Sequence, residues 1–205
     1  HQARFSLSVR QRAADYFYTY TYNDAIRWAN DLSPETILDF QGHYLFQKLN
    51  ARLEYYNITD GIYLASDTSV KQSGENISIL KASLGYSFRP GNFGIEPYIC
   101  YQEVSTENYY RLPPLYGSLS LYYKRAFFKK ALYAALGIDI FFISSYKPDA
   151  YIPQLRSFMQ QDIKETDDFF IGDVFIRFQV KRARFFLKYY HFNALFMEHN
   201  YYTIP

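Results

Sequence analysis

The chain has 205 residues, and 21% of them are aromatic, with 23 Tyr and 19 Phe but a single Trp. The 22 basic and 20 acidic residues give a net charge of +2, and this balance argues against a nucleic-acid partner, since no face-specific basic excess is visible. No apolar run reaches the roughly 20 residues of a membrane helix, and the single Cys100 excludes an intramolecular disulfide and a cysteine-based metal cluster.

Alternation of apolar and polar residues is the strongest pattern, and it predicts strands with one apolar and one polar face. Leu80, Ala82 and Leu84, for example, are separated by polar residues. Most of the runs exceed the roughly 5–6 residues usual in soluble strands, and they suit the roughly 9–11 that a tilted strand needs to cross a bilayer. In chain order, the predicted strands cover residues 5–12, 38–47, 49–55, 80–89, 95–102, 118–124, 132–142, 173–181 and 184–193.

The connections between these strands alternate between short and long. Short ones are expected at residues 48–49, 89–92, 126–130 and 181–184, and long ones at 13–35, 58–75, 103–115 and 145–168. The last long connection is expected to carry a helical turn. Outer-membrane barrels have short periplasmic turns and long external loops. We therefore predict an all-β, antiparallel, up-and-down transmembrane β-barrel, of which at least nine strands lie in this chain.

The abundance of tyrosine supports a membrane setting, because the ring of tyrosine prefers sites that are apolar at one end and wet at the other. Aromatic girdles of this kind mark both rims of a barrel. A soluble lipocalin-like binder is disfavoured, because several strands carry large aromatic residues on both faces. The sequence therefore favours the bacterial outer membrane.

Charged residues of both signs fall on the polar face of the predicted strands. They are expected to point inward, because Arg or Lys on the lipid face costs about 2–4 kcal/mol near the midplane. Two roles stay open: they line a water-filled pore, or they pair across strands and tie the wall to a plug. These lumen-lining candidates are Arg10, Arg12, Arg52, Glu54, Lys81, Glu96, Asp139, Asp173, Arg177 and Lys188.

Basic residues also gather around the short connections. They invite a phosphate or lipid-headgroup interpretation, but turn residues of a water-exposed rim are charged for solubility, and we favour that interpretation. The set consists of Lys48, Arg89, Lys124, Arg125, Lys129, Lys130, Lys181, Arg182 and Arg184.

Nothing in the sequence predicts an enzyme. The four histidines, His1, His43, His191 and His199, are far apart and lack the spacing of metal ligands. No GxSxG motif accompanies His191, and a hydrolase needs a nucleophile, a base and an orienting group together. We expect no catalytic residue, no metal and no cofactor.

Two runs resemble the putative porin family of Bacteroidota outer membranes: YGSLSLYYKRAFFKKALYAALGIDIFFISSYKPDAYIPQL, from Tyr116 to Leu155, and the closing run from Asp173 to Pro205. The segment NDAIRWAND, from Asn23 to Asp31, is similar to an aromatic–polar loop of that family. The resemblance implies the C-terminal portion of a longer barrel that continues past Pro205 into a last strand. We therefore expect residues 1–205 to be one barrel segment of a chain truncated at both ends.

Two functions follow as hypotheses. The first is a porin for passive diffusion of small hydrophilic solutes, with outer-membrane lipid around it. The second is a non-conducting barrel that serves as a scaffold or partner of other outer-membrane or secretion-complex proteins, for example in protein export. Tyrosine-rich loops, such as the one with Tyr16, Tyr18 and Tyr20, suit either hypothesis.

Overall fold

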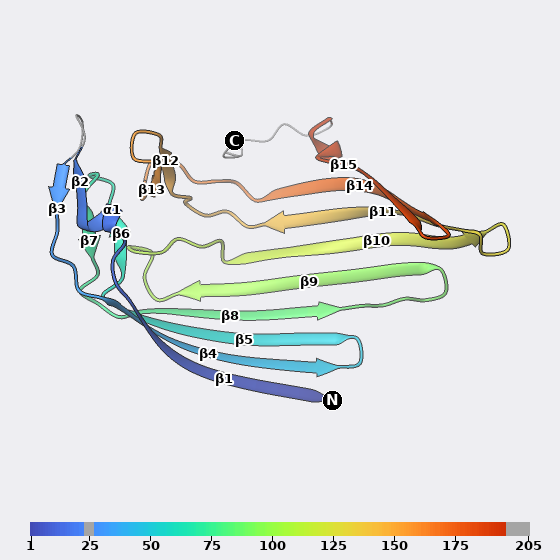
Figure 1. Cartoon of the computed structure of the whole chain (residues 1–205), viewed down its shortest axis with the longest axis horizontal. Helices are drawn as coiled ribbons and strands as arrows, with labels where there is room; N and C mark the ends of the chain where they lie inside the picture. The colour runs from blue at the N-terminus through green and yellow to red at the C-terminus, as the bar shows by residue number, and fades with distance from the viewer. Residues whose placement is uncertain (23–26, 196–205) are drawn as a thin grey trace.

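Nine long strands form a single antiparallel sheet in the computed structural model, which describes residues 1–22 and 27–195. Each strand is hydrogen-bonded to the next long strand along the chain, so the sheet is an up-and-down meander (Figure 1). The predicted all-β antiparallel fold is confirmed. In sheet order, the strands are β1 (Gln2–Arg12), β4 (Glu35–Phe46), β5 (Leu49–Thr59), β8 (Ile77–Tyr86), β9 (Phe93–Val104), β10 (Leu115–Phe127), β11 (Leu132–Ile143), β14 (Phe169–Val180) and β15 (Ala183–Tyr189).

The short and long connections lie at opposite ends of the sheet (Figure 1). The tight turns at residues 47–48, 87–92, 128–131 and 181–182 form the turn end, on the right of the figure. They contain residues in the left-handed region, including Gln47 at φ 51°, Gly91 at φ 59° and Lys181 at φ 52°, because reversing a twisted strand in few residues requires positive φ. The long connections, at residues 13–34, 60–76, 105–114 and 144–168, form the loop end.

The long connections at the loop end carry structure of their own. A helical turn, α1 (Tyr16–Thr19), precedes the hairpin of β2 (Tyr20–Tyr22) and β3 (Arg27–Ala29). The second loop holds β6 (Ile62–Leu64) and β7 (Val70–Gln72), and the fourth holds β12 (Ala150–Ile152) and β13 (Ser157–Met159). The helical turn predicted for the fourth loop is wrong: complementary short strands pair there instead.

The last predicted strand also differs from the structure. The alternation predicts a strand over residues 184–193, but β15 ends at Tyr189 and a 3-10 helix, η1 (Phe192–Leu195), follows. The Asn193 side chain donates to the carbonyl oxygen of Phe170 at 2.7 Å and accepts from the Gly172 N–H at 2.8 Å, so it holds this turn against β14. In the part of the chain that the structure describes, no helix is long and apolar enough to span a membrane.

The two faces of the sheet differ in chemistry. On the apolar face, Leu121 of β10 lies opposite Ile95 and Ile138, and Leu121 and Ile138 are 37% and 38% exposed although both are in the middle of strands. Residues directly opposite one another in a sheet share a face, so the register assigns every strand position to this apolar face or to the polar face behind it. The large apolar residues exposed on the apolar face include Phe5, Leu7, Val9, Leu53, Leu84, Ile99, Leu136, Ile176 and Leu187.

A small core lies on the polar face near the loop end. Ile58, Ile77 and Ile79 are buried there, and Tyr110 and Leu112 of the third loop pack against them. The third loop therefore folds inward over the sheet rather than away from it.

Candidate functional site

The register places all ten lumen-lining candidates on the polar face. Arg12 lies opposite Glu35, Glu54 opposite Lys81, and Asp139 opposite Asp173, and the remaining candidates follow by counting two residues along each strand. The set so placed is Arg10, Arg12, Arg52, Glu54, Lys81, Glu96, Asp139, Asp173, Arg177 and Lys188. The register therefore establishes which face of the sheet these residues occupy.

Two arginines of β1 form ion pairs with β4. Arg10 lies 3.4 Å from Asp39 and Arg12 lies 3.2 Å from Glu35. The Glu35 side chain is only 3% exposed, so this carboxylate depends on Arg12 for its main electrostatic compensation. Glu35 and Asp39 were absent from the predicted set. Asp39 follows the same alternation as its neighbours, whereas the sequence predicts that Glu35 lies in the preceding loop.

A three-residue charge cluster joins β11, β14 and β15. The Lys188 ammonium lies 3.3 Å from Asp139 and 2.9 Å from Asp173, and these two aspartates face each other across neighbouring strands. The Ser120 hydroxyl donates to Asp139 at 2.7 Å, and the backbone N–H of His191 donates to Asp173 at 3.0 Å. The sequence named all three charged residues but not their association, which depends on the register.

Four other candidates form no ion pair in the described part of the chain, and one of them is Arg177 of β14. Arg52, Glu54 and Lys81 occupy adjacent positions of the polar face on β5 and β8. The Lys81 ammonium lies 5.7 Å from the centre of the Tyr56 ring, a cation–π distance. These residues therefore present charge to solvent on the polar face.

The last candidate, Glu96, binds a residue of the turn end. A single carboxylate oxygen of Glu96 accepts from the guanidinium of Arg89 at 2.8 and 3.1 Å and from the Tyr122 hydroxyl at 2.9 Å. Glu96 thereby neutralises Arg89 and holds the Tyr122 ring in place.

The interpretation of the basic set as turn residues is wrong for three of its members. Lys124 and Arg125 lie within β10 and Arg184 lies within β15. The register places Lys124 and Arg184 on the polar face and Arg125 on the apolar face. Strand β10 continues past its expected end at residue 124 because residues 125–127 pair with β11.

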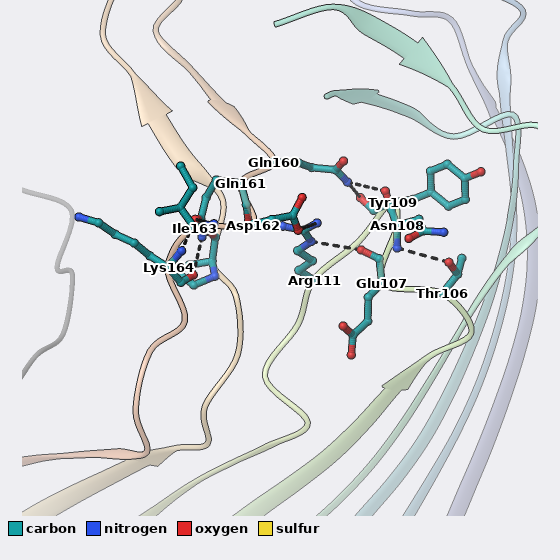
Figure 2. Close-up of polar contacts among 11 residues, drawn as sticks. Thr106, Glu107, Asn108, Tyr109, Arg111, Gln160, Gln161, Asp162, Ile163 and Lys164 are labelled. Atoms are coloured by element: carbon teal, nitrogen blue, oxygen red, sulfur yellow. Dashed lines mark hydrogen bonds and ion pairs between the residues drawn. The ribbon is translucent and has the colours of Figure 1, made fainter. Parts of the chain in front are cut away.

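The third and fourth loops are tied together around Arg111, whose side chain is 11% exposed (Figure 2). The Arg111 guanidinium lies 2.7 Å from Asp162, donates to the carbonyl oxygen of Gln161 and donates to that of Glu107 at 3.2 Å. The side chain of Gln160 donates to the carbonyl oxygens of residues 108 and 109 at 2.8 and 3.0 Å. Two donor side chains and five acceptors from two loops thus meet at one place.

Contacts to the other loops extend this network into a loop cap, by which we mean residues 13–22, 27–34, 60–76, 105–114 and 144–168. The N–H of Gln160 donates to the carbonyl oxygen of Leu64 at 3.0 Å, and the Tyr63 and Tyr109 rings meet edge to face at 5.0 Å. The Gln72 side chain donates to the carbonyl oxygen of Ser33 at 2.8 Å. Burial raises the pKa of the Tyr110 hydroxyl, and the nearby Glu35 carboxylate adds to this effect.

We expect Arg111→Met to loosen the loop cap without unfolding the sheet. The substitution leaves the carbonyl oxygens of Glu107 and Gln161 without their donor, and local openings cost less free energy when such bonds are lost. Amide hydrogen exchange should accelerate at least about tenfold across residues 105–114 and 160–164, because one bond to a charged donor is worth about 1.5–3 kcal/mol. Unchanged exchange there, or equal acceleration in β4 and β5, would contradict a local role for Arg111.

The described residues hold no group of three or more His, Cys, Asp or Glu side chains arranged for a metal ion. Of the segment Asn23–Asp31, the structure describes residues 27–31. Residues 23–26 lie outside the described residues, as do His199 and the end of the closing run. The indole N–H of Trp28 donates to the carbonyl oxygen of Phe17 at 2.8 Å, which anchors the described part of that loop.

Comparison with known proteins gives a family and two structural relatives. The family described as "Putative porin" matches residues 1–205. The fold is similar to that of the copper transporter OprC, with a TM-score of 0.65 at 17% identity over 92% of this chain and 30% of that one. It is also similar to the FrpB iron transporter from Neisseria meningitidis (F3-3 variant), with a TM-score of 0.50 at 13% identity over 80% and 26% of the two chains. No curated protein matches the sequence.

At these identities the two transporters inform the fold alone, and the chain spans less than a third of either of them. The family match carries more, because it covers every residue. An antiparallel up-and-down sheet with an exposed apolar face agrees with it, and the predicted bacterial outer-membrane location is confirmed. By sequence and by fold, the chain belongs to the putative porin family and is part of an outer-membrane β-barrel.

Proposed function

We propose that the barrel to which this chain contributes passes small hydrophilic solutes across the outer membrane by passive diffusion. The observation that supports this is the division of the sheet into a face with large exposed apolar residues and a face with charges of both signs. Lipid covers the apolar face at no cost, and the charges avoid the penalty of the hydrocarbon region only if they point into water. The polar face then lines an aqueous lumen.

In this proposal the protein is a pore and not an enzyme, and it needs no cofactor. Its partners are outer-membrane lipid on the apolar face and hydrophilic solutes on the polar face. Arg52, Glu54 and Lys81 are the wall charges that passing ions meet, since they form no ion pair in the described part of the chain.

Single-channel conductance of the full-length protein in a planar bilayer tests the proposal. We expect stepwise conductance, and we expect Arg52→Glu to shift the reversal potential toward cation selectivity. Glu54→Gln, at a neighbouring position of the polar face, should shift it the opposite way, so each variant controls for the other. Silence from protein shown to be folded and inserted would refute free diffusion.

A second candidate function has its own support. The loop cap packs over the loop end of the polar face, where Tyr109 and Leu112 contact buried isoleucines, and its loops are bonded to one another. A cap of this kind suits a non-conducting barrel that acts as a scaffold for other outer-membrane or secretion-complex proteins. A silent, folded barrel that retains partner proteins in a pull-down, and loses them when the third loop is shortened, would favour this alternative.

A further inference from the structure

A cavity of about 620 Å³ lies on the polar face near the turn end, between β10 and β15. A second cavity, of about 340 Å³, adjoins it and shares Arg89, Tyr122, Lys124 and Tyr133 with it. Small-molecule sites are concave, mostly of about 300–1,000 Å³, and combine aromatic walls with few polar groups. The cavity lies at the opposite end of the sheet from the loop cap.

The register explains how the cavity arises. Ala135 of β11 stands directly between Lys124 of β10 and Arg177 of β14. Two strand spacings, about 10 Å, separate the backbones of Lys124 and Arg177, and the methyl group of Ala135 leaves the space between them unfilled. Arg184 of β15 joins them from two positions nearer the turn.

In the described part of the chain, carboxylates balance only one of the four cations of this cavity. Glu96 neutralises Arg89 at 2.8 Å. In contrast, within residues 1–22 and 27–195 no carboxylate lies at ion-pair distance from Lys124, Arg177 or Arg184. Among the described residues, these three cations therefore have no carboxylate partner.

Two of these cations, Lys124 and Arg177, lie close to aromatic rings. The Arg177 guanidinium lies 4.3 Å from the centre of the Phe175 ring and 5.5 Å from that of Phe186. The Lys124 ammonium lies 5.9 Å from the Tyr133 ring. A ring face orients a cation without neutralising it, so these groups keep their charge and lose part of their mobility. Both changes favour binding of an anion.

We propose that this cavity is a binding subsite for the phosphate or carboxylate group of a small solute in the lumen. Guanidinium groups bind such anions through paired hydrogen bonds, and an ammonium adds a point charge. The inference rests on the proposed pore function in one respect: the pore is the route by which a solute reaches the cavity. Solubility of the rim does not account for Lys124, Arg177 and Arg184, because all three lie within strands.

A lipid headgroup carries the same phosphate chemistry, but the geometry favours a solute. Lys124 and Arg177 are on the polar face, behind the apolar face that lipid covers. Arg125, the neighbour of Lys124, is on the apolar face, and it is therefore the basic residue that a headgroup would reach. This pair of adjacent residues supplies a matched control.

The test is isothermal titration of the full-length protein in detergent micelles with inorganic pyrophosphate. Lys124→Gln and Arg177→Gln should each weaken binding about tenfold or more, the effect expected for one charged hydrogen-bond donor. Arg125→Gln should change the affinity by less than about twofold. Equal losses in all three variants, or no pyrophosphate binding by the unaltered protein, would overturn the subsite. Displacement of pyrophosphate by phosphatidylglycerol added to the micelles would overturn the solute in favour of a headgroup.

Planar-bilayer recordings separate this inference from the proposed function. Conductance without pyrophosphate binding would refute the subsite and still support the pore. Pyrophosphate binding by a barrel that does not conduct would support the subsite and refute the pore. If both hold, millimolar pyrophosphate should reduce the conductance of the unaltered protein and leave that of Lys124→Gln nearly unchanged.

Discussion

Lys188→Met is expected to lower the free energy of unfolding of the full-length barrel by about 3–5 kcal/mol, the usual cost of removing one partner of a buried ion pair. Lys188 lies 2.9 Å from Asp173, whose side chain is 5% exposed, and 3.3 Å from Asp139. The two aspartates are opposite one another on β11 and β14. Without the ammonium, two like charges face each other across the ladder with little water to screen them.

The double variant Lys188→Met/Asp173→Asn supplies the control. The amide of asparagine has nearly the shape of the carboxylate and still accepts the N–H of His191, while Asp139 keeps the Ser120 hydroxyl. We expect it to recover more than half of the lost stability in guanidinium unfolding of the reconstituted protein. A single variant within about 1 kcal/mol of the unaltered protein would show that water in the lumen already screens the cluster.

Leu121→Arg is expected to destabilise the inserted barrel by about 2–4 kcal/mol, the cost of an arginine on the lipid face near the midplane. Leu121 is at the centre of β10 (Leu115–Phe127) and lies between Ile95 and Ile138 on the apolar face. The guanidinium has no carboxylate to reach among these neighbours. Equilibrium unfolding of the full-length protein in lipid vesicles measures the effect.

Ser120→Arg places the same side chain one residue earlier, on the polar face. There it lies opposite Glu96 and Asp139, two carboxylates, so we expect a loss below about 1 kcal/mol. Equal losses at positions 120 and 121 would mean that the two faces do not meet different solvents. Such a result would refute the assignment of the apolar face to lipid.

The strands were predictable because two solvents act on the sheet from opposite sides. Each position of β8, for example, meets lipid or water, so the sequence must alternate as Leu80, Lys81, Ala82, Ser83 and Leu84 do. This period is local, and it placed all ten charged candidates on one face before any pairing was known. The strict alternation of short and long connections was also predictable, because the two ends of the strands of an outer-membrane barrel face different compartments.

What the sequence could not predict depends on contacts between distant residues. Arg111 and Asp162 meet across 51 positions, and no local pattern marks either of them. The end of β10 was missed where a further charge follows the expected last residue: Arg125 continues the strand beyond Lys124, and the strand ends at Phe127. The partners of Lys188 required the register between β11, β14 and β15, which follows from turn geometry rather than from composition.

A row of alternating glycines and large aromatic residues crosses the polar face from β9 to β14. In it, Gly94 and Gly137 flank Tyr122, and Phe175 follows. A Cβ at Gly94 would come within 2.1 Å of the Tyr122 ring, and one at Gly137 within 2.4 Å of the Phe175 ring. Each ring therefore packs flat against the sheet over a glycine instead of projecting away from the sheet. In the proposed pore, a side chain at either glycine would raise the ring above it and narrow the passage sterically, with every wall charge unchanged.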